Sequence, residues 1–281
     1  MIDLHCHSTA SDGLLAPAAV VRFAAGTGLS AIALTDHDTT AGLAEAQDTG
    51  LALGVRVIGG CEFSVAAEWG EMHVLGLFVP SGDQAIEGFL TAARADRERR
   101  ARAMVSALVG LGINISYQEV LREAAGGAVG RPHVARALLN LGAVQTVQEA
   151  FDRYIGKNRP AYVDKGLPTF ANVARLVHTA GGIVSAAHLR YRATLAGLTQ
   201  LQAEGLDAVE TRHPSHDGEV VANITAMAAR LGLARTGGSD WHGEMQPEAA
   251  HAMLGVQAVP DDWLPVLEAA RPSSGGRVPW T

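Results

Sequence analysis

Short runs of β-forming residues alternate with longer stretches of helical composition along this chain, and this alternation restricts the fold more than any other feature. Seven runs read as strands: Ile2–His7, Ala31–His37, Val55–Glu62, Met72–Phe78, Ile183–His188, Ala208–Thr211 and Ala234–Asp240. Helical stretches follow most of them, at Pro17–Thr27, Ala41–Thr49, Thr194–Glu204 and Gly218–Leu231. Strands that alternate with helices are typical of βαβ units. The pattern therefore predicts an α/β fold with barrel-like repetition.

The alternation stops between residues 83 and 167. This region reads as successive helices with no strand between them, at Ala85–Leu111, Tyr117–Ala125, Pro132–Leu141 and Val147–Ile155. We interpret it as an inserted helical module. The predicted organisation is a barrel made of residues 1–98 and 167–270, a helical insertion at residues 99–166, and a loose Pro/Gly/Ser-rich tail at residues 271–281. We expect the insertion to cap whatever site the loops of the barrel form.

Length and composition exclude several classes of protein. With 281 residues, 48% of them hydrophobic and 18% charged, the chain can bury a large core and is not a disordered protein. A net charge of −7 argues against binding duplex DNA by charge alone. The sequence shows no secretory signal, no disulfide framework and no apolar run of about 18 residues, so we expect a cytoplasmic location and no membrane partner. It leaves the oligomeric state open.

Histidines and acidic residues gather at the ends of the predicted strands. Six of the 11 histidines and three acids do so: His5, His7, His37, His73, His188, His242, Asp12, Glu62 and Asp240. In a β/α barrel the C-terminal strand ends meet at one rim. Imidazole and carboxylate groups favour Mn, Zn or Fe over soft metals. Nine candidate ligands exceed the need of one ion, so we expect two or three divalent ions, with Mn first.

The alternative for each of these residues is a structural role. A single histidine near a strand end is more often a satisfied polar residue than a ligand, but six of them with three acids make coincidence improbable. Cys6 and Cys61 flank candidate ligands and alternate away from them, so we expect small buried hydrophobic side chains there.

A second group of residues suits a phosphate. Gly130-Arg131-Pro132-His133 opens a predicted helix, where backbone N–H groups already favour an anion, so Arg131 and His133 are candidate substrate contacts. An ordinary helix start is the alternative. His213, in the stretch His-Pro-Ser-His, is the leading phosphate contact or leaving-group acid, although loop polarity alone often explains such a cluster. Ser11 and Arg190 stand beside candidate metal ligands and are weaker candidates.

The ordered motifs of this chain resemble those of the polymerase and histidinol phosphatase (PHP) superfamily. The matching stretches are Asp3-Leu4-His5-Cys6-His7-Ser8, Thr35-Asp36-His37-Asp38, Gly60-Cys61-Glu62, His73, Ala187-His188 and Gly238-Ser239-Asp240-Trp241-His242. Their order and spacing across residues 2–242 are far more specific than a single His-x-His pair. The resemblance implies a distorted (β/α)7 TIM-like barrel.

The resemblance also implies how the ligands are shared among metal positions. It implies that His5, His7, Glu62 and Asp240 surround the first ion, that Glu62, His73 and His188 hold the second, and that Asp12, His37 and His242 hold the third. Family members differ in whether the third position is filled. The Gly-Arg-Pro-His and His-Pro-Ser-His stretches are similar to those of a nucleotide-directed subgroup that includes 3′,5′-bisphosphate nucleotidases and 5′–3′ exoribonucleases.

From this resemblance we expect a metal-dependent phosphoric monoester hydrolase. The expected reaction removes the 3′-phosphate from a nucleoside 3′,5′-bisphosphate, such as adenosine 3′,5′-bisphosphate, and leaves the 5′-monophosphate. Asp240, Arg131 and His213 are the expected catalytic residues, and a small nucleotide or short oligoribonucleotide is the expected partner.

Four alternatives remain open at this stage. They are a 5′–3′ exoribonuclease acting on short 5′-phosphorylated RNA, a histidinol phosphatase, a non-catalytic metal-binding scaffold and an amidohydrolase. The last is disfavoured because the lysine that often bridges two zinc ions in amidohydrolases has no counterpart here. Lys157 and Lys165 both fall in or next to the insertion.

Overall fold

The computed structural model describes residues 1–126, 129–164, 166–243 and 253–272. The chain forms two compact units, Met1–Glu87 with Leu167–Thr281 and Gly88–Gly166. The second unit begins eleven residues before the position expected for the insertion. The reason is that a single helix, α3 (Gln84–Gly110), runs without a break through residues 98 and 99. Lys165 and the tail from residue 273 onward lie outside the described residues.

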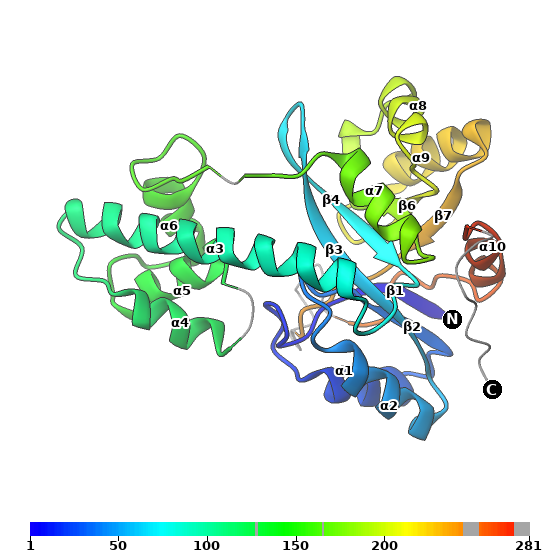
Figure 1. The fold of residues 1–281 in the computed structure, drawn as a ribbon, viewed down its shortest axis with the longest axis horizontal. Coiled ribbons are helices and arrows are strands. Elements are labelled where there is room, and N and C mark those ends of the chain that lie inside the picture. Colours follow the sequence, from blue (N-terminus) through cyan, green and yellow to red (C-terminus); the bar gives the residue numbers. More distant parts are fainter. Residues whose placement is uncertain (127–128, 165, 244–252, 273–281) are drawn as a thin grey trace. The chain divides into compact units, whose positions relative to one another are not determined.

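The first unit is built on a seven-stranded sheet (Figure 1) whose strands follow one another in chain order. They are β1 (Ile2–Cys6), β2 (Ala31–Leu34), β3 (Arg56–Ala67), β4 (Gly70–Leu77), β5 (Ile183–Ala186), β6 (Ala208–Arg212) and β7 (Ala234–Gly237). The segment after β7 returns to β1, since the Asp240 N–H donates to the His5 carbonyl at 2.8 Å and the His7 N–H donates to the Trp241 carbonyl at 2.9 Å. The sheet is therefore a nearly closed barrel, and the predicted fold class is confirmed.

Strand β4 departs from the expected parallel repeat. It runs antiparallel to both β3 and β5, with Ser64 opposite His73 and Val74 opposite Ala186. A short turn rather than a helix joins β3 to β4. The expectation that His73 lies at the C-terminal end of its strand was therefore wrong. It is the fourth residue of β4, and the reversed direction brings this early part of β4 to the rim where the parallel strands end.

Helices cover the strands of the first unit, and α1 and α2 lie along β1 and β2 in Figure 1. The helices are α1 (Pro17–Gly26), α2 (Leu43–Leu53), α7 (Phe170–Thr179), α8 (Leu195–Ala203), α9 (Gly218–Leu231) and α10 (Trp263–Ala269), with a short 3₁₀ turn, η2, at Arg190–Arg192. The side chains of Thr169, Thr194 and Asp217 cap α7, α8 and α9 by accepting a first-turn N–H. Among the described helices, none is both long and apolar enough to cross a membrane.

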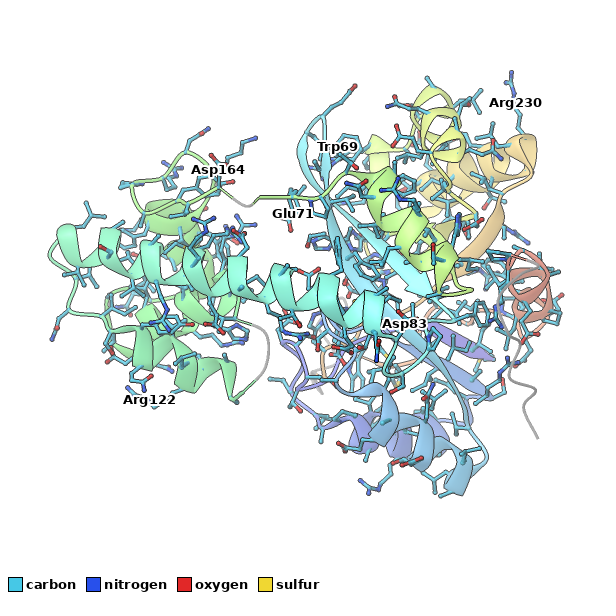
Figure 2. All side chains as sticks on the ribbon, in the orientation of Figure 1. Trp69, Glu71, Asp83, Arg122, Asp164 and Arg230 are labelled. Atoms are coloured by element: carbon cyan, nitrogen blue, oxygen red, sulfur yellow. The ribbon has the colours of Figure 1, made fainter. Side chains whose placement is uncertain are left out.

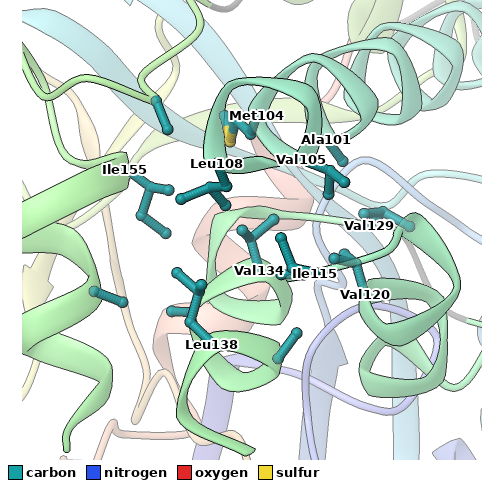
Figure 3. Close-up of a cluster of buried hydrophobic side chains, with 14 of the residues drawn as sticks. Ala101, Met104, Val105, Leu108, Ile115, Val120, Val129, Val134, Leu138 and Ile155 are labelled. Carbon is teal, nitrogen blue, oxygen red and sulfur yellow. The ribbon is translucent and has the colours of Figure 1, made fainter. Parts of the chain in front are cut away.

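The second unit has a hydrophobic core of its own, which Figure 3 shows in close-up. It holds most of α3, then α4 (Tyr117–Ala124), α5 (Arg131–Asn140), α6 (Val147–Ala150) and the π-helical turn η1 (Phe151–Ile155). Leu108, Val134, Leu138 and Ile155 are completely buried in this core. Such a core is what a unit needs to keep its own structure.

Candidate metal centre

Glu62 lies at the centre of the rim, near the middle of β3, and is almost wholly buried. Its Oε2 is 3.2 Å from a ring nitrogen of each of three histidines, His5, His7 and His37. Its Oε1 is 2.8 Å from Nδ1 of His73 and 3.1 Å from Nε2 of His188. A single carboxylate thus contacts five of the six histidines that the sequence singled out.

Two further carboxylates extend this cluster. Asp240 Oδ1 is 3.2 Å from Nε2 of His5 and 3.0 Å from Nε2 of His7. Asp12 Oδ1 is 3.4 Å from Nε2 of His242, and Asp12 Oδ2 is 4.0 Å from Nε2 of His37. The structure therefore brings all nine residues that the sequence indicated as ligands into one connected group.

The group divides into smaller sets, each with the donor atoms within 4.8 Å of one another. Three of the sets are His5/His7/Glu62/Asp240, His37/Glu62/His73 and His7/Asp12/His37/His242. The first has the composition implied for the first metal position. The other two sets differ from those that the resemblance implies. His37 is a member of both, and His7 is also a member of the third. His188 reaches the second set through its contact with Glu62 Oε1.

The geometry of these donor atoms fits divalent ions. Both ring nitrogens of His7 and Nδ1 of His37 are buried without a well-formed hydrogen bond to any described group. Donor atoms that share an ion at ~2.0–2.2 Å lie about 3.0–3.5 Å from one another. The contacts of Glu62 and Asp240 with His5 and His7 fall in this range, at 3.0–3.2 Å.

Without an ion, the cluster is an array of strongly perturbed groups. Burial alone would lower the pKa of His7, but the carboxylates of Asp240 and Glu62 outweigh it and raise that pKa to about 10. The same opposition, with Glu62 as the main partner, raises the pKa of His73 to about 9. Burial prevails at His37 and lowers its pKa to about 3. Burial works against the charge of Glu62 too, but neighbouring imidazoles keep its pKa well below the usual value.

The backbone at the rim adopts conformations that are unusual for residues other than glycine. His188, Arg190 and Asp240 have positive φ angles of 31°, 56° and 51°. Conformations of this kind persist where the surroundings hold them, and they cluster at functional sites. Gly238 is needed here for a different reason, because a Cβ atom at this position would lie 2.4 Å from Cβ of His5.

Several acidic residues of the site were missed by sequence reasoning. Glu210, fully buried in β6, is 3.1 Å from Nδ1 of His5 and accepts the N–H of His188 at 2.7 Å. Asp36 accepts hydrogen bonds from the N–H and hydroxyl of Ser8, both at 2.7 Å. Glu71, labelled in Figure 2, is 3.5 Å from Nε2 of His73. The available signal was an acid within a predicted strand, as for Asp36 and Glu210, or directly before one, as for Glu71.

The rim also holds three of the predicted substrate contacts. His213 is buried, and its Nδ1 accepts the N–H of Ser215 at 3.0 Å, which places the proton of the neutral ring on Nε2, 3.3 Å from Asp240 Oδ2. The Ser11 hydroxyl donates to Asp36 at 2.7 Å. Arg190 has an exposed side chain and is the first residue of η2. Their roles toward a substrate stay predictions.

Arg131 and His133 belong to the second unit. Gly130 is the N-cap of α5, Arg131 is its first residue, and the Gly130 N–H donates to Nδ1 of the buried His133 at 2.9 Å. The Arg131 guanidinium lies 5.9 Å from the centre of the Phe151 ring. His133 thus helps to order the start of α5, and the contact of either residue with a phosphate stays a prediction.

Known proteins resemble the chain over nearly its full length. It is 34% identical over 245 residues to a protein of Haemophilus influenzae named 5′-3′ exoribonuclease, covering 85% of this chain and 89% of that one. It is 33% identical over 249 residues to a 3′,5′-nucleoside bisphosphate phosphatase of Chromobacterium violaceum, covering 86% and 87%. A solved structure from Bifidobacterium adolescentis, classed as a metal-dependent phosphoesterase, matches with a TM-score of 0.86 and 31% identity over 99% of this chain and 97% of that one.

The match to a family model agrees with these similarities. Residues 3–234 match the model described as the PHP domain, and this range includes eight of the residues gathered at the rim: His5, His7, Asp12, His37, Glu62, His73, His188 and Glu210. The order of the motifs, the nearly closed barrel and the clustered rim residues are all accounted for by one assignment. The chain belongs to the PHP domain family.

Proposed function

We propose that this protein is a metal-dependent phosphoesterase that removes the 3′-phosphate from a nucleoside 3′,5′-bisphosphate and leaves the 5′-monophosphate. The observation that carries the proposal is the convergence of six histidines and three acids on one rim, around Glu62 and Asp240. The relative from Chromobacterium violaceum that is named 3′,5′-nucleoside bisphosphate phosphatase supports this specificity.

The proposed ligands form three sets, two of which share Glu62. His5, His7, Glu62 and Asp240 would hold one ion, Glu62, His73 and His188 a second, and Asp12, His37 and His242 a third. Divalent ions bound there, with Mn expected first and Zn or Fe as alternatives, would neutralise the phosphate charge and lower the pKa of a water nucleophile.

The protein groups around the rim would bind the substrate and move a proton. The Nε2 proton of His213 faces Asp240, so the neutral ring can donate a hydrogen bond to a phosphate oxygen, and the imidazolium form of the same ring would be the acid that protonates the leaving oxygen. Ser11 and Arg190 would contribute further phosphate contacts. Arg131, at the first position of α5, would bind the second phosphate of the substrate with its guanidinium, assisted by the helix N-terminus and by His133.

A second candidate is hydrolysis of short 5′-phosphorylated RNA from its 5′ end. The relative from Haemophilus influenzae that is named 5′-3′ exoribonuclease favours it at a similar level of identity. The two reactions share attack on a phosphorus atom and differ in the bond that breaks and in the group that leaves. One site could therefore support both.

A comparison of three substrates tests the proposal. Protein freed of metal with a chelator and reconstituted with Mn²⁺ is assayed on adenosine 3′,5′-bisphosphate, a 5′-phosphorylated diribonucleotide and histidinol phosphate. We expect the highest kcat/KM with the bisphosphate. A preference for the dinucleotide would identify the exoribonuclease, and a preference for histidinol phosphate would identify a histidinol phosphatase. If the metal-loaded protein turns over none of the three substrates, the protein is a non-catalytic metal-binding scaffold.

The role of Arg131 is tested by Arg131→Ala. If the guanidinium binds the second phosphate, KM for the bisphosphate rises about 10-fold or more, since a charge-assisted hydrogen bond contributes ~1.5–3 kcal/mol. The KM for a single-phosphate substrate, such as adenosine 3′-monophosphate, stays unchanged. Arg136→Ala is the matched control, because Arg136 lies on the same helix and pairs with Glu123. Equal effects of the two variants on the bisphosphate would contradict the assignment.

A further inference from the structure

Glu210 is a buried carboxylate whose two oxygens are committed to two different metal-site residues. Oε1 lies 3.1 Å from Nδ1 of His5, and Oε2 accepts the backbone N–H of His188 at 2.7 Å. The side chain is completely buried, and β6 has an irregular register to β7 at this residue. His5 and His188 come from the two separate segments of the first unit, Met1–Glu87 and Leu167–Thr281, so Glu210 joins residues that the chain order separates.

We propose that Glu210 is a positioning residue that fixes which nitrogen of His5 is offered to a metal ion and holds the His188 backbone in place. This inference rests on the proposed function, because it assumes that the rim binds divalent ions. It adds a residue that lies outside the nine proposed ligands.

The first part of the argument concerns the His5 ring. An ionised carboxylate only accepts hydrogen bonds, so His5 must carry a proton on Nδ1 to bond to Glu210. The lone pair of the neutral ring then lies on Nε2. That atom is 3.2 Å from Glu62 Oε2 and 3.2 Å from Asp240 Oδ1. An ion shared by the three residues would be bound among these donor atoms. Outer carboxylates of this kind fix the tautomer and orientation of metal-binding histidines.

The second part concerns the His188 backbone. Its φ angle of 31° is unfavourable for a residue with a side chain, and the contact to Glu210 holds the N–H of this same residue. The His188 ring reaches Glu62 Oε1 at 3.1 Å from this backbone position. Glu210 therefore fixes one residue of the first proposed metal position and one of the second.

The variant Glu210→Gln keeps the size of the side chain and replaces one of its two hydrogen-bond acceptors by a donor. If the amide oxygen accepts the His188 N–H, the amide NH₂ faces Nδ1 of His5 and forces the ring proton onto Nε2, where it blocks a metal ion. If the amide turns over, its NH₂ faces the His188 N–H, donor against donor. A glutamine cannot satisfy both contacts, whereas the carboxylate does.

Asp207→Asn is the matched control. Asp207 also joins a histidine to a backbone amide, because its Oδ2 is 2.7 Å from Nε2 of His178 and accepts the Val184 N–H at 2.8 Å. It precedes β6 in the same unit, and neither of these contacts is with a proposed ligand. Asp207 is partly buried, and the cost of replacing a carboxylate that bonds a histidine and a backbone amide is therefore expected in both variants.

The test measures the number of ions bound per chain and the Kd for Mn²⁺ and Zn²⁺ by calorimetry, on chelator-treated full-length protein. We expect binding by Glu210→Gln to weaken about 10–100-fold at one position, while Asp207→Asn binds as the wild type does. Unchanged binding by Glu210→Gln, or equal weakening in both variants, would overturn the inference. Failure of the wild type to bind either ion would instead count against the proposed function.

A measurement on the unaltered protein decides the matter if Glu210→Gln does not fold. In the Zn²⁺-loaded wild type, long-range ¹H–¹⁵N correlation spectra distinguish the two ring nitrogens of His5. A proton on Nδ1 with the ion on Nε2 supports the inference. Metal on Nδ1 would refute it.

Discussion

Asp240 combines a backbone role and a side-chain role in one residue. Its N–H donates to the His5 carbonyl at 2.8 Å, and its carboxylate is 3.0 Å from Nε2 of His7. Asparagine tolerates the positive φ of 51° better than most residues, so Asp240→Asn keeps the backbone and removes only the charge.

We expect Asp240→Asn to lower kcat/KM at least about 100-fold, because it removes the negative charge of a proposed ligand, and the loss of an outer partner alone typically costs ~10–100-fold. Phosphate release and metal content are measured together on the same preparation. Asp262→Asn, at the exposed start of α10, serves as the control. Undiminished turnover in Asp240→Asn would remove this residue from the proposed machinery.

His178 gives the protein a pH-dependent contribution to stability away from the rim. A hydrogen bond to Asp207 raises the pKa of His178 in the folded state, against a smaller effect of burial. A raised folded pKa means that the stabilisation is complete below the unfolded pKa, about 6.5, and is lost as pH rises through the folded pKa.

The pH prediction is tested with His178→Gln. The free energy of unfolding of wild type minus that of the variant is measured from pH 5.5 to 9 on metal-free protein, so that the rim contributes equally to both. We expect the difference to be largest at the acid end and to shrink toward high pH. A difference that grows with pH would show that the sign is wrong.

At the scale of elements, the close approach of the segment after β7 to β1 depends on one glycine. A Cβ atom at Gly238 would lie 2.4 Å from Cβ and 2.5 Å from the backbone nitrogen of His5. A contact of this kind cannot be relieved by turning a flexible side chain, so the strands must separate.

We expect Gly238→Ala to destabilise the fold by about 1–3 kcal/mol and to weaken metal binding, because it displaces β1 and its histidines. The control is Gly88→Ala in the interior of α3, where a Cβ atom meets nothing within 4 Å. That change should stabilise the helix by roughly 0.5–1 kcal/mol. Denaturant unfolding measures both, and a neutral Gly238→Ala would contradict the proposed packing.

The strands were predictable from sequence, but their directions were not. Runs of β-forming residues with turn signals gave the position of all seven strands to within a few residues, apart from the far end of β3, which continues to Ala67. Alternation along a strand has the same period in both directions, so nothing local indicated that β4 is reversed. Helix α7 carried a readable N-cap at Thr169 and was missed, as was the short helix α10.

The residues of the rim were predictable because strand ends and motif order both single them out. The grouping of these residues around separate ions was less predictable, because His37 contacts both Glu62 and Asp12 and belongs to two sets of donor atoms. Glu210 shows the limit of this reasoning. Its partners are 205 and 22 residues away in the chain, and only the closed barrel brings them together.

At the scale of the whole molecule, bound metal should stabilise the barrel because the proposed ligands come from separate strands. A ligand at 100 times its Kd adds ~2.7 kcal/mol, and for a unit of about 200 residues each kcal/mol raises Tm by about 2–4 °C. We expect Mn²⁺ to raise the Tm of chelator-treated protein by roughly 5–10 °C.

Thermal unfolding followed by circular dichroism, with and without Mn²⁺, checks this expectation. The second unit has its own core, so a transition that belongs to it should not move with Mn²⁺. Asp240→Asn should show a smaller rise than the wild type. An identical Tm with and without the ion, at saturating concentration, would contradict metal binding at the rim.

The order of the rim residues along the chain has a consequence for biosynthesis. His5 and His7 leave the ribosome first, whereas Asp240 and His242 follow more than 230 residues later. A nascent chain therefore exposes a pair of imidazoles long before the carboxylate that completes their set has been translated. Metal binding by the proposed set His5, His7, Glu62 and Asp240 would therefore have to wait until the segment after the last strand has been made.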